Sequence, residues 1–207
     1  MEYILSLIIG YSLGSIPTAY IILMRAKGID ISSTGSGNIG AMNSYEVTKS
    51  KKIGLIVFLI DFLKGLLSVL ITRVLFNDVF IYPSLALLFA IFSHCFNPWL
   101  NFKGGRGLAT AAGGTILFFP YLLAVWIILW ILVYITKKDI LIANIFATVV
   151  SLLTIFLTQD LALNYVYPDP ASAGELMLLS AGGLLNIFIK HIEPLKEIIS
   201  KKRDVKK

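Results

Sequence analysis

Long apolar runs separated by short polar segments dominate this chain. Most of the runs hold about 20 residues with few charges, the length that an α-helix needs to cross a bilayer. The run at 107–119 is short for a bilayer, which is typical of a tilted, sunken or half-spanning helix, and Pro120 is expected to make a sharp turn into the next run. The predicted helices lie near residues 3–24, 53–76, 80–97, 107–119, 120–136, 139–159 and 172–190.

The composition agrees with a membrane protein. Hydrophobic residues make up 57% of the chain and charged residues only 14%, which excludes a disordered chain and argues against a soluble domain. We therefore expect an all-α integral membrane protein of about seven transmembrane helices, forming a single polytopic domain over residues 1–207. The first run has no basic segment in front of it, so it is interpreted as a retained span and not as a signal peptide.

The basic residues predict the orientation of these spans. All 18 lysines and arginines except Lys64 and Arg73 fall in the segments 25–52, 98–107, 137–138 and 190–207, which the predicted spans place on one side. The positive-inside rule then gives an external N-terminus and a cytosolic C-terminus, with a basic cytosolic tail at about 191–207. The net charge of +6 is expected to face anionic lipid headgroups, so no nucleic-acid partner is predicted.

The first polar cluster on the predicted cytosolic face is GSGNIGAMN, residues 35–43. Its glycines lack side chains, so backbone N–H groups can approach an anion, while serine and asparagine add hydrogen-bonding groups. A flexible turn between two spans is the simpler alternative. The match to a dinucleotide-binding fingerprint is discounted because no strand precedes it. The candidate phosphate-binding residues are Gly35, Ser36, Gly37, Asn38, Gly40 and Asn43.

The second cluster is FKGGRGLAT, residues 102–110, directly before a predicted helix. Lys103 would supply a point charge and Arg106 a planar fork for phosphate oxygens, and the helix N-terminus adds aligned N–H groups. A basic turn that binds lipid headgroups is the alternative. The candidates here are Lys103, Gly104, Gly105, Arg106, Gly107 and Thr110.

The third cluster is His191, which lies at the end of the last predicted span between Lys190 and Glu193. A histidine at a helix C-terminus is equally typical of an interfacial residue favoured by the helix dipole, so both interpretations stay open.

Three further polar residues are predicted to support the site. Asp61 and Lys64 are three residues apart and can pair on one helix face, and a structural ion pair is the favoured interpretation. His94 precedes Lys103 by nine residues. It could orient the second loop or bind substrate, and a structural role is the favoured interpretation. No group of histidines, cysteines and carboxylates has metal-ligand spacing, so no metal is predicted.

These segments resemble a known family. The chain is similar to the bacterial membrane acyl-phosphate:glycerol-3-phosphate acyltransferases, the PlsY family, most densely over about residues 10–115. The resemblance implies seven spans with the motifs on the cytosolic face of the bacterial inner membrane. The shared features, in order, are SLGSIPTAY (12–20), KGIDI (27–31), GSGNIGAMN, DFLKG (61–65), His94 and FKGGRGLAT.

The resemblance also implies a reaction. A fatty acyl group would move from acyl phosphate to the 1-hydroxyl of sn-glycerol 3-phosphate, giving lysophosphatidic acid and phosphate without a cofactor. By the family pattern, Ser36, Lys103 and His191 are the catalytic candidates, and the glycine loops bind phosphate. No serine or cysteine is recognisably paired with a base, so we expect direct transfer without an acyl-enzyme.

The chain departs from the family pattern at several positions. Glu46 stands where the family has an arginine, Met42 where it has a threonine, and Pro194 where it has an asparagine; Arg106 replaces a lysine and keeps the charge. Glu46 and Pro194 leave room for a non-catalytic or altered-specificity paralogue that binds glycerol phosphate or anionic lipid. A small transporter is the third alternative.

Overall fold

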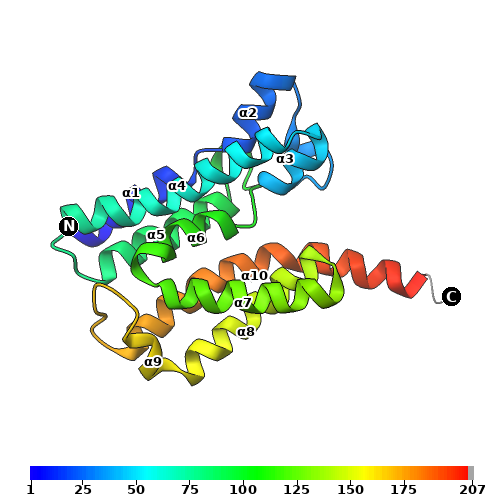
Figure 1. Cartoon of the computed structure of the whole chain (residues 1–207). Coiled ribbons are helices and arrows are strands. Elements are labelled where there is room, and N and C mark those ends of the chain that lie inside the picture. The colour runs from blue at the N-terminus through cyan, green and yellow to red at the C-terminus, as the bar shows by residue number, and fades with distance from the viewer. Residues whose placement is uncertain (205–207) are drawn as a thin grey trace.

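The computed structural model describes residues 1–204, without the side chains at 197–198 and 201–204, and its elements in that range are all helices (Figure 1). The α-helices are α1 (Glu2–Gly14), α2 (Thr18–Lys27), α3 (Ala41–Thr48), α4 (Lys51–Leu75), α5 (Ile81–Cys95), α6 (Leu108–Phe118), α7 (Pro120–Lys137), α8 (Ile140–Leu157), α9 (Gln159–Leu163) and α10 (Ala173–Asp204). Short 3-10 turns cover Ile31–Ser33 and Pro98–Leu100.

Six stretches of the described chain are long and apolar enough to cross a membrane, and they coincide with six of the predicted spans. The expected class, an all-α integral membrane protein, is confirmed. The remaining predicted span corresponds to α6, whose 11 residues are fewer than the roughly 20 that a full crossing needs. The count of seven crossings therefore stays a prediction.

The first span is broken, where the sequence pattern predicted one continuous helix. Pro17 has no backbone N–H and fixes its own φ, so α1 ends before it and α2 begins after it. Two buried side chains satisfy carbonyls freed by the break: Asn97 Nδ2 donates to Ser15 O at 2.7 Å, and Lys64 Nζ donates to Ile16 O at 2.5 Å. Such compensation is what permits a helix break at membrane depth.

The last span also differs from its prediction. It was expected to end near residue 190, but α10 runs on to Asp204 with Pro194 inside it. The described part of the basic tail therefore continues the helix. One proline removes a single backbone donor, and the residues around it are good helix formers.

The helices form two groups (Figure 1). In the first, α1 packs along α5 and α4 along α6. Glycines allow this close approach, since a Cβ on Gly10 would lie 1.9 Å from Ala86 O and one on Gly113 would lie 1.8 Å from Phe62 O. In the second group, α7 packs on α8, and α10 packs on both α8 and α5. The helix α10 thereby joins the two groups.

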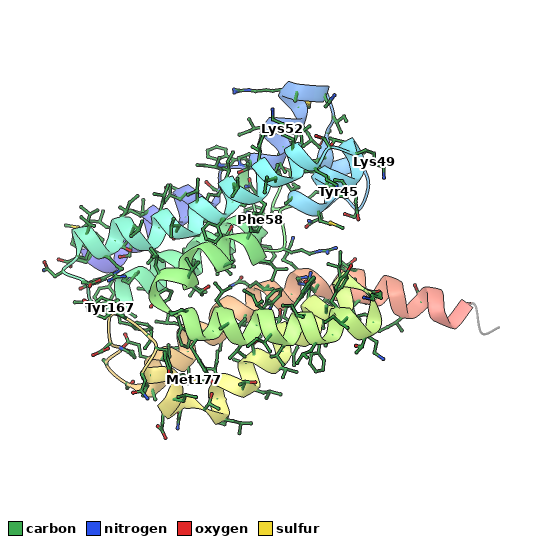
Figure 2. The ribbon with its side chains drawn as sticks, in the orientation of Figure 1. Tyr45, Lys49, Lys52, Phe58, Tyr167 and Met177 are labelled. Carbon is green, nitrogen blue, oxygen red and sulfur yellow. The ribbon has the colours of Figure 1, made fainter. Side chains whose placement is uncertain are left out.

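The polar loops gather at one end of the molecule. Tyr45, Lys49 and Lys52 lie at this end, while Tyr167 and Met177 lie at the opposite end (Figure 2). The loops at 28–50 and 96–107 both belong to the first of these ends, which we call the motif end.

Candidate active site

Asn43 shapes the first glycine loop from within. It lies in the first turn of α3 and is only 1% exposed. Its Nδ2 donates to Thr34 O at 3.0 Å and to Asn38 O at 2.9 Å, and its Oδ1 accepts from Ser36 N at 3.0 Å. The sequence predicted that Asn43 binds phosphate. In the structure these three bonds go to its own loop, so the residue sets the shape of the loop.

The glycines around Ser36 are required by this shape. Gly35 and Gly37 have φ of +65° and +67°, in the left-handed region that favours glycine. A Cβ on Gly35 would also come within 2.3 Å of Asn43 Oδ1. Ser36 is exposed between these two glycines, so the turn presents its hydroxyl at the surface.

The second glycine loop lies directly against the first. Ile39 N donates to Gly104 O at 3.4 Å, and Gly105 N donates to His94 O at 3.1 Å. Lys103 is exposed on this loop, and its charge acts on Asp30 across the contact. The pKa of Asp30 lies below its ordinary value, mainly because the Ser32 hydroxyl and N–H donate to the carboxylate, with a smaller contribution from Lys103. The two loops therefore form one polar surface.

The third cluster meets the second loop at Arg106. Gly107 has φ of +80° and caps the start of α6, with the half-buried Arg106 just before it. Arg106 is close enough for its charge to act on His191, which is 1% exposed. His191 Nδ1 lies 2.7 Å from Ile187 O, and its Nε2 lies 3.4 Å from Asn144 Nδ2. The structure thus places all three predicted clusters at the motif end.

The three supporting residues form a buried group behind the second loop. Lys64 Nζ lies 2.6 Å from Asp61 Oδ1, so the structure shows the pairing that their spacing predicts. His94 Nδ1 is 3.8 Å from the same oxygen. A Cβ on Gly105 would lie 2.1 Å from His94 Nε2, so the histidine ring packs against the loop backbone. This contact explains why glycine is needed at that position.

The other predicted residues have contrasting positions. Thr110 is buried where α6 meets α4, and its Oγ1 has no hydrogen-bond partner among the described residues. Gly40 is buried at the start of α3. Met42 and Glu46 are exposed on α3, with Glu46 one helical turn after Asn43. In residues 1–204, no three His, Cys, Asp or Glu side chains gather into a group that could hold a metal.

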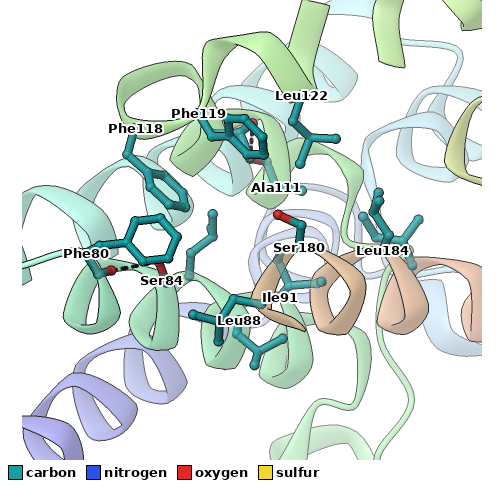
Figure 3. Close-up of a pocket in the computed structure, with 15 residues that line it drawn as sticks. Phe80, Ser84, Leu88, Ile91, Ala111, Phe118, Phe119, Leu122, Ser180 and Leu184 are labelled. Carbon is teal, nitrogen blue, oxygen red and sulfur yellow. Dashed lines mark hydrogen bonds between the residues drawn. The ribbon is translucent and has the colours of Figure 1, made fainter. Parts of the chain in front are cut away.

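An apolar pocket that the sequence did not predict lies between α5, α6 and α10 (Figure 3). The pocket is narrow, with a cavity volume of about 50 Å³. Phe80 and Phe118 lie side by side at one end, with ring centroids 5.8 Å apart. Two lining residues, Ile91 and Ile187, lie 3.1 and 3.4 Å from a Cβ placed on Gly107. Ile91 and Ile187 therefore lie between the pocket and Gly107, the residue that follows Arg106.

A family model described as glycerol-3-phosphate acyltransferase matches residues 4–201. The chain is 34% identical to a glycerol-3-phosphate acyltransferase of Ehrlichia canis (96% of this chain and 95% of the relative), and 37% identical to one of Streptococcus mutans (97% and 92%).

Two solved structures are similar to the fold. Both are crystal structures of PlsY (YgiH), an integral membrane glycerol 3-phosphate acyltransferase, at 27% identity and covering 97% of this chain. The glycerol 3-phosphate form has a TM-score of 0.79 with 94% of its chain covered, and the lysophosphatidic acid form has 0.77 with 93% covered.

Proposed function

Because the chain belongs to the glycerol-3-phosphate acyltransferase family, it transfers an acyl group to glycerol 3-phosphate, and we propose that an acyl phosphate supplies this group at the motif end. Two observations carry the proposal. The two glycine loops are in contact, and the second of them bears Lys103 and Arg106. An apolar pocket lies near this loop, since its lining residues Ile91 and Ile187 contact the Gly107 position. A phosphate-binding loop near an apolar pocket suits an acyl phosphate, which carries both a phosphate and an alkyl chain.

The acyl phosphate would lie with its phosphate at the second glycine loop and its alkyl chain in the apolar pocket. Its phosphate would meet Arg106 and the N-terminal N–H groups of α6, where the helix dipole favours an anion. Its alkyl chain would lie in the pocket between α5, α6 and α10. Each methylene buried there contributes about 0.8 kcal/mol. The phenylalanines at the far end, Phe80 and Phe118, would then contact the end of the chain.

Glycerol 3-phosphate would bind on the exposed surface of the two loops. Lys103 and the Ser36 hydroxyl are both exposed there and can contact its phosphate. PlsY has been crystallised in glycerol 3-phosphate and lysophosphatidic acid forms, which supports the same acceptor and product for this chain.

The reaction needs no acyl-enzyme. The glycerol 1-hydroxyl oxygen attacks the acyl carbonyl carbon, the new ester C–O bond forms, and the bond from carbon to the phosphate oxygen breaks. The hydroxyl proton passes to His191 Nε2 or to an oxygen of the departing phosphate, which leaves as inorganic phosphate. Lys103 and Arg106 stabilise its charge. Cys95, the single cysteine, is fully buried and therefore poorly placed to act as a nucleophile.

The direct test is turnover by the purified protein. With palmitoyl phosphate and glycerol 3-phosphate, phosphate and lysophosphatidic acid should appear in equal amounts. Lys103→Ala should raise the KM for a phosphate substrate, whereas Lys137→Ala, an exposed lysine at the end of α7, should not. Product formation with an acyl thioester but not with the acyl phosphate would overturn the donor assignment.

We also infer that the motif end faces the cytosol of a bacterial inner membrane, because the basic residues of the loops gather there. Lys52→Cys at this end and Asp169→Cys at the other would be labelled with an impermeant thiol reagent. Buried Cys95 should give little background. Labelling of Lys52→Cys from outside intact cells would refute the orientation.

A further inference from the structure

A chain of hydrogen bonds crosses from α7 through α8 to α10 and ends at His191. Trp130 Nε1 donates to Asn144 Oδ1 at 2.7 Å. Asn144 Nδ2 lies 3.4 Å from His191 Nε2, and His191 Nδ1 lies 2.7 Å from Ile187 O. Asn144 and His191 are both buried. Neither Trp130 nor Asn144 belongs to a motif noted in the sequence.

The two ends of this series of hydrogen bonds, Trp130 and Ile187 O, determine where the hydrogens between them lie. An indole N–H can only donate, so the amide atom that faces Trp130 is the oxygen of Asn144. The NH₂ group then faces His191, and Nε2 must accept from it. A backbone carbonyl can only accept, so Nδ1 must carry the hydrogen that it shares with Ile187 O. Both routes give the same tautomer of His191, with the hydrogen on Nδ1.

The location of His191 gives this tautomer a chemical consequence. The charge of Arg106 acts on the ring, and Ile187, one turn earlier on α10, packs against the Gly107 position. A neutral ring avoids a second positive charge beside Arg106. With Nδ1 committed to a backbone carbonyl, Nε2 is the one acceptor that the ring can offer to a hydroxyl.

We propose that Asn144 and Trp130 are positioning residues for His191, which hold its ring as the neutral Nδ1–H tautomer beside the second glycine loop. In the proposed reaction, on which this role rests, the 1-hydroxyl of glycerol 3-phosphate replaces Asn144 at Nε2 and donates its hydrogen bond there. The contact of 3.4 Å between Asn144 and Nε2 is longer than an ordinary hydrogen bond, which makes this exchange easy.

The tautomer can be measured without any turnover. The chain has two histidines, so ¹⁵N-histidine labelling of the full-length protein in detergent gives two ring systems, and His94→Gln assigns them. We expect the His191 ring proton on Nδ1 alone. A proton on Nε2 in the wild-type protein would overturn the proposal.

Two variants test the residues that impose the tautomer. Asn144→Asp keeps the acceptor for Trp130 but can no longer donate, so Nε2 of His191 should become protonated. Trp130→Phe frees the amide to turn, so both tautomers should appear. Trp126→Phe is the matched control, because Trp126 on the same helix donates instead to Thr148 Oγ1 at 3.1 Å. Asn144→Asp with a proton on Nδ1 alone, or equal changes in the two tryptophan variants, would contradict the proposal.

Kinetics then separate positioning from mere stability. In Asn144→Asp, kcat should fall about 100-fold, the low end of what a positioned proton acceptor contributes, while the KM for glycerol 3-phosphate stays close to wild type because the phosphate loops are unchanged. Trp126→Phe should retain kcat. An unchanged kcat in Asn144→Asp would refute the positioning role. If the wild-type protein shows no turnover, the proposed function fails, while the tautomer measurement still decides whether Asn144 orients His191.

Discussion

The buried pair of Asp61 and Lys64 makes a quantitative prediction about stability. The two residues are 2% and 3% exposed, and Lys64 Nζ lies 2.6 Å from Asp61 Oδ1. Lys64→Met keeps most of the length of the side chain but removes its charge, leaving the Asp61 carboxylate buried without a cation. His94 Nδ1, at 3.8 Å, is too far away to replace the lost hydrogen bond.

The expected cost comes mainly from the unpaired carboxylate. Removing one partner of a buried ion pair costs about 3–5 kcal/mol of unfolding free energy. The carbonyl of Ile16 loses the bond from Lys64 but still accepts from Thr18 N at 2.9 Å, so it adds little. The double variant Asp61→Leu with Lys64→Met removes both charges, and its stability should be close to that of the wild type.

The measurement is reversible unfolding of the purified protein in detergent, followed by the fluorescence of its three tryptophans. Leu63→Met, an exposed neighbour on α4, is the control and should be neutral. If Lys64→Met were as stable as the double variant, the uncompensated charge would not be the cause and the reasoning would fail.

Three other predictions concern the loops and the far end of the molecule. Asn43→Asp keeps the acceptor for the loop N–H but loses both donated bonds, so the loop should become sensitive to proteases and the KM for glycerol 3-phosphate should rise; an unchanged KM would show that loop shape does not matter. Glu46→Arg places a cation one turn from Asn43 and should lower that KM by about tenfold, equivalent to about 1.4 kcal/mol for one charge-assisted bond; Glu46→Gln should have a smaller effect. At the far end, hydrogen bonds from Arg73 lower the pKa of Asp78, so this carboxylate stabilises the fold above its unfolded pKa of about 3.9 and loses that contribution as the pH falls through the folded pKa. The thermal midpoint of Asp78→Asn should therefore lie below wild type at pH 7 and converge with it on acidification.

The sequence predicted the helical spans and the loops that would meet, because apolar length and glycine clusters are local signals. It did not predict how Asn43 is used. A sequence motif identifies a polar residue, but it does not predict whether the side chain faces a ligand or its own loop. The break before Pro17 could have been read from that proline, since an interior proline interrupts the hydrogen bonding of a helix.

Asn144 and the apolar pocket were missed for different reasons. Asn144 lies within an apolar run, and its partners Trp130 and His191 are 14 and 47 residues away, so only tertiary packing reveals the connection. A polar residue inside a predicted span was the available signal. The pocket could not be predicted from the sequence, because its lining residues are apolar, as are the residues that face the lipid.

Because α6 is short, we expect the rate of the reaction to depend on the thickness of the bilayer. Eleven residues rise about 16 Å, roughly half of a hydrocarbon core of about 30 Å. Either the second glycine loop or the turn at Phe119 must therefore lie below the headgroups, or the bilayer must thin around them. We expect turnover in vesicles to depend on the chain length of the host lipid. The lipids that such an enzyme helps to make would then influence the rate at which it works.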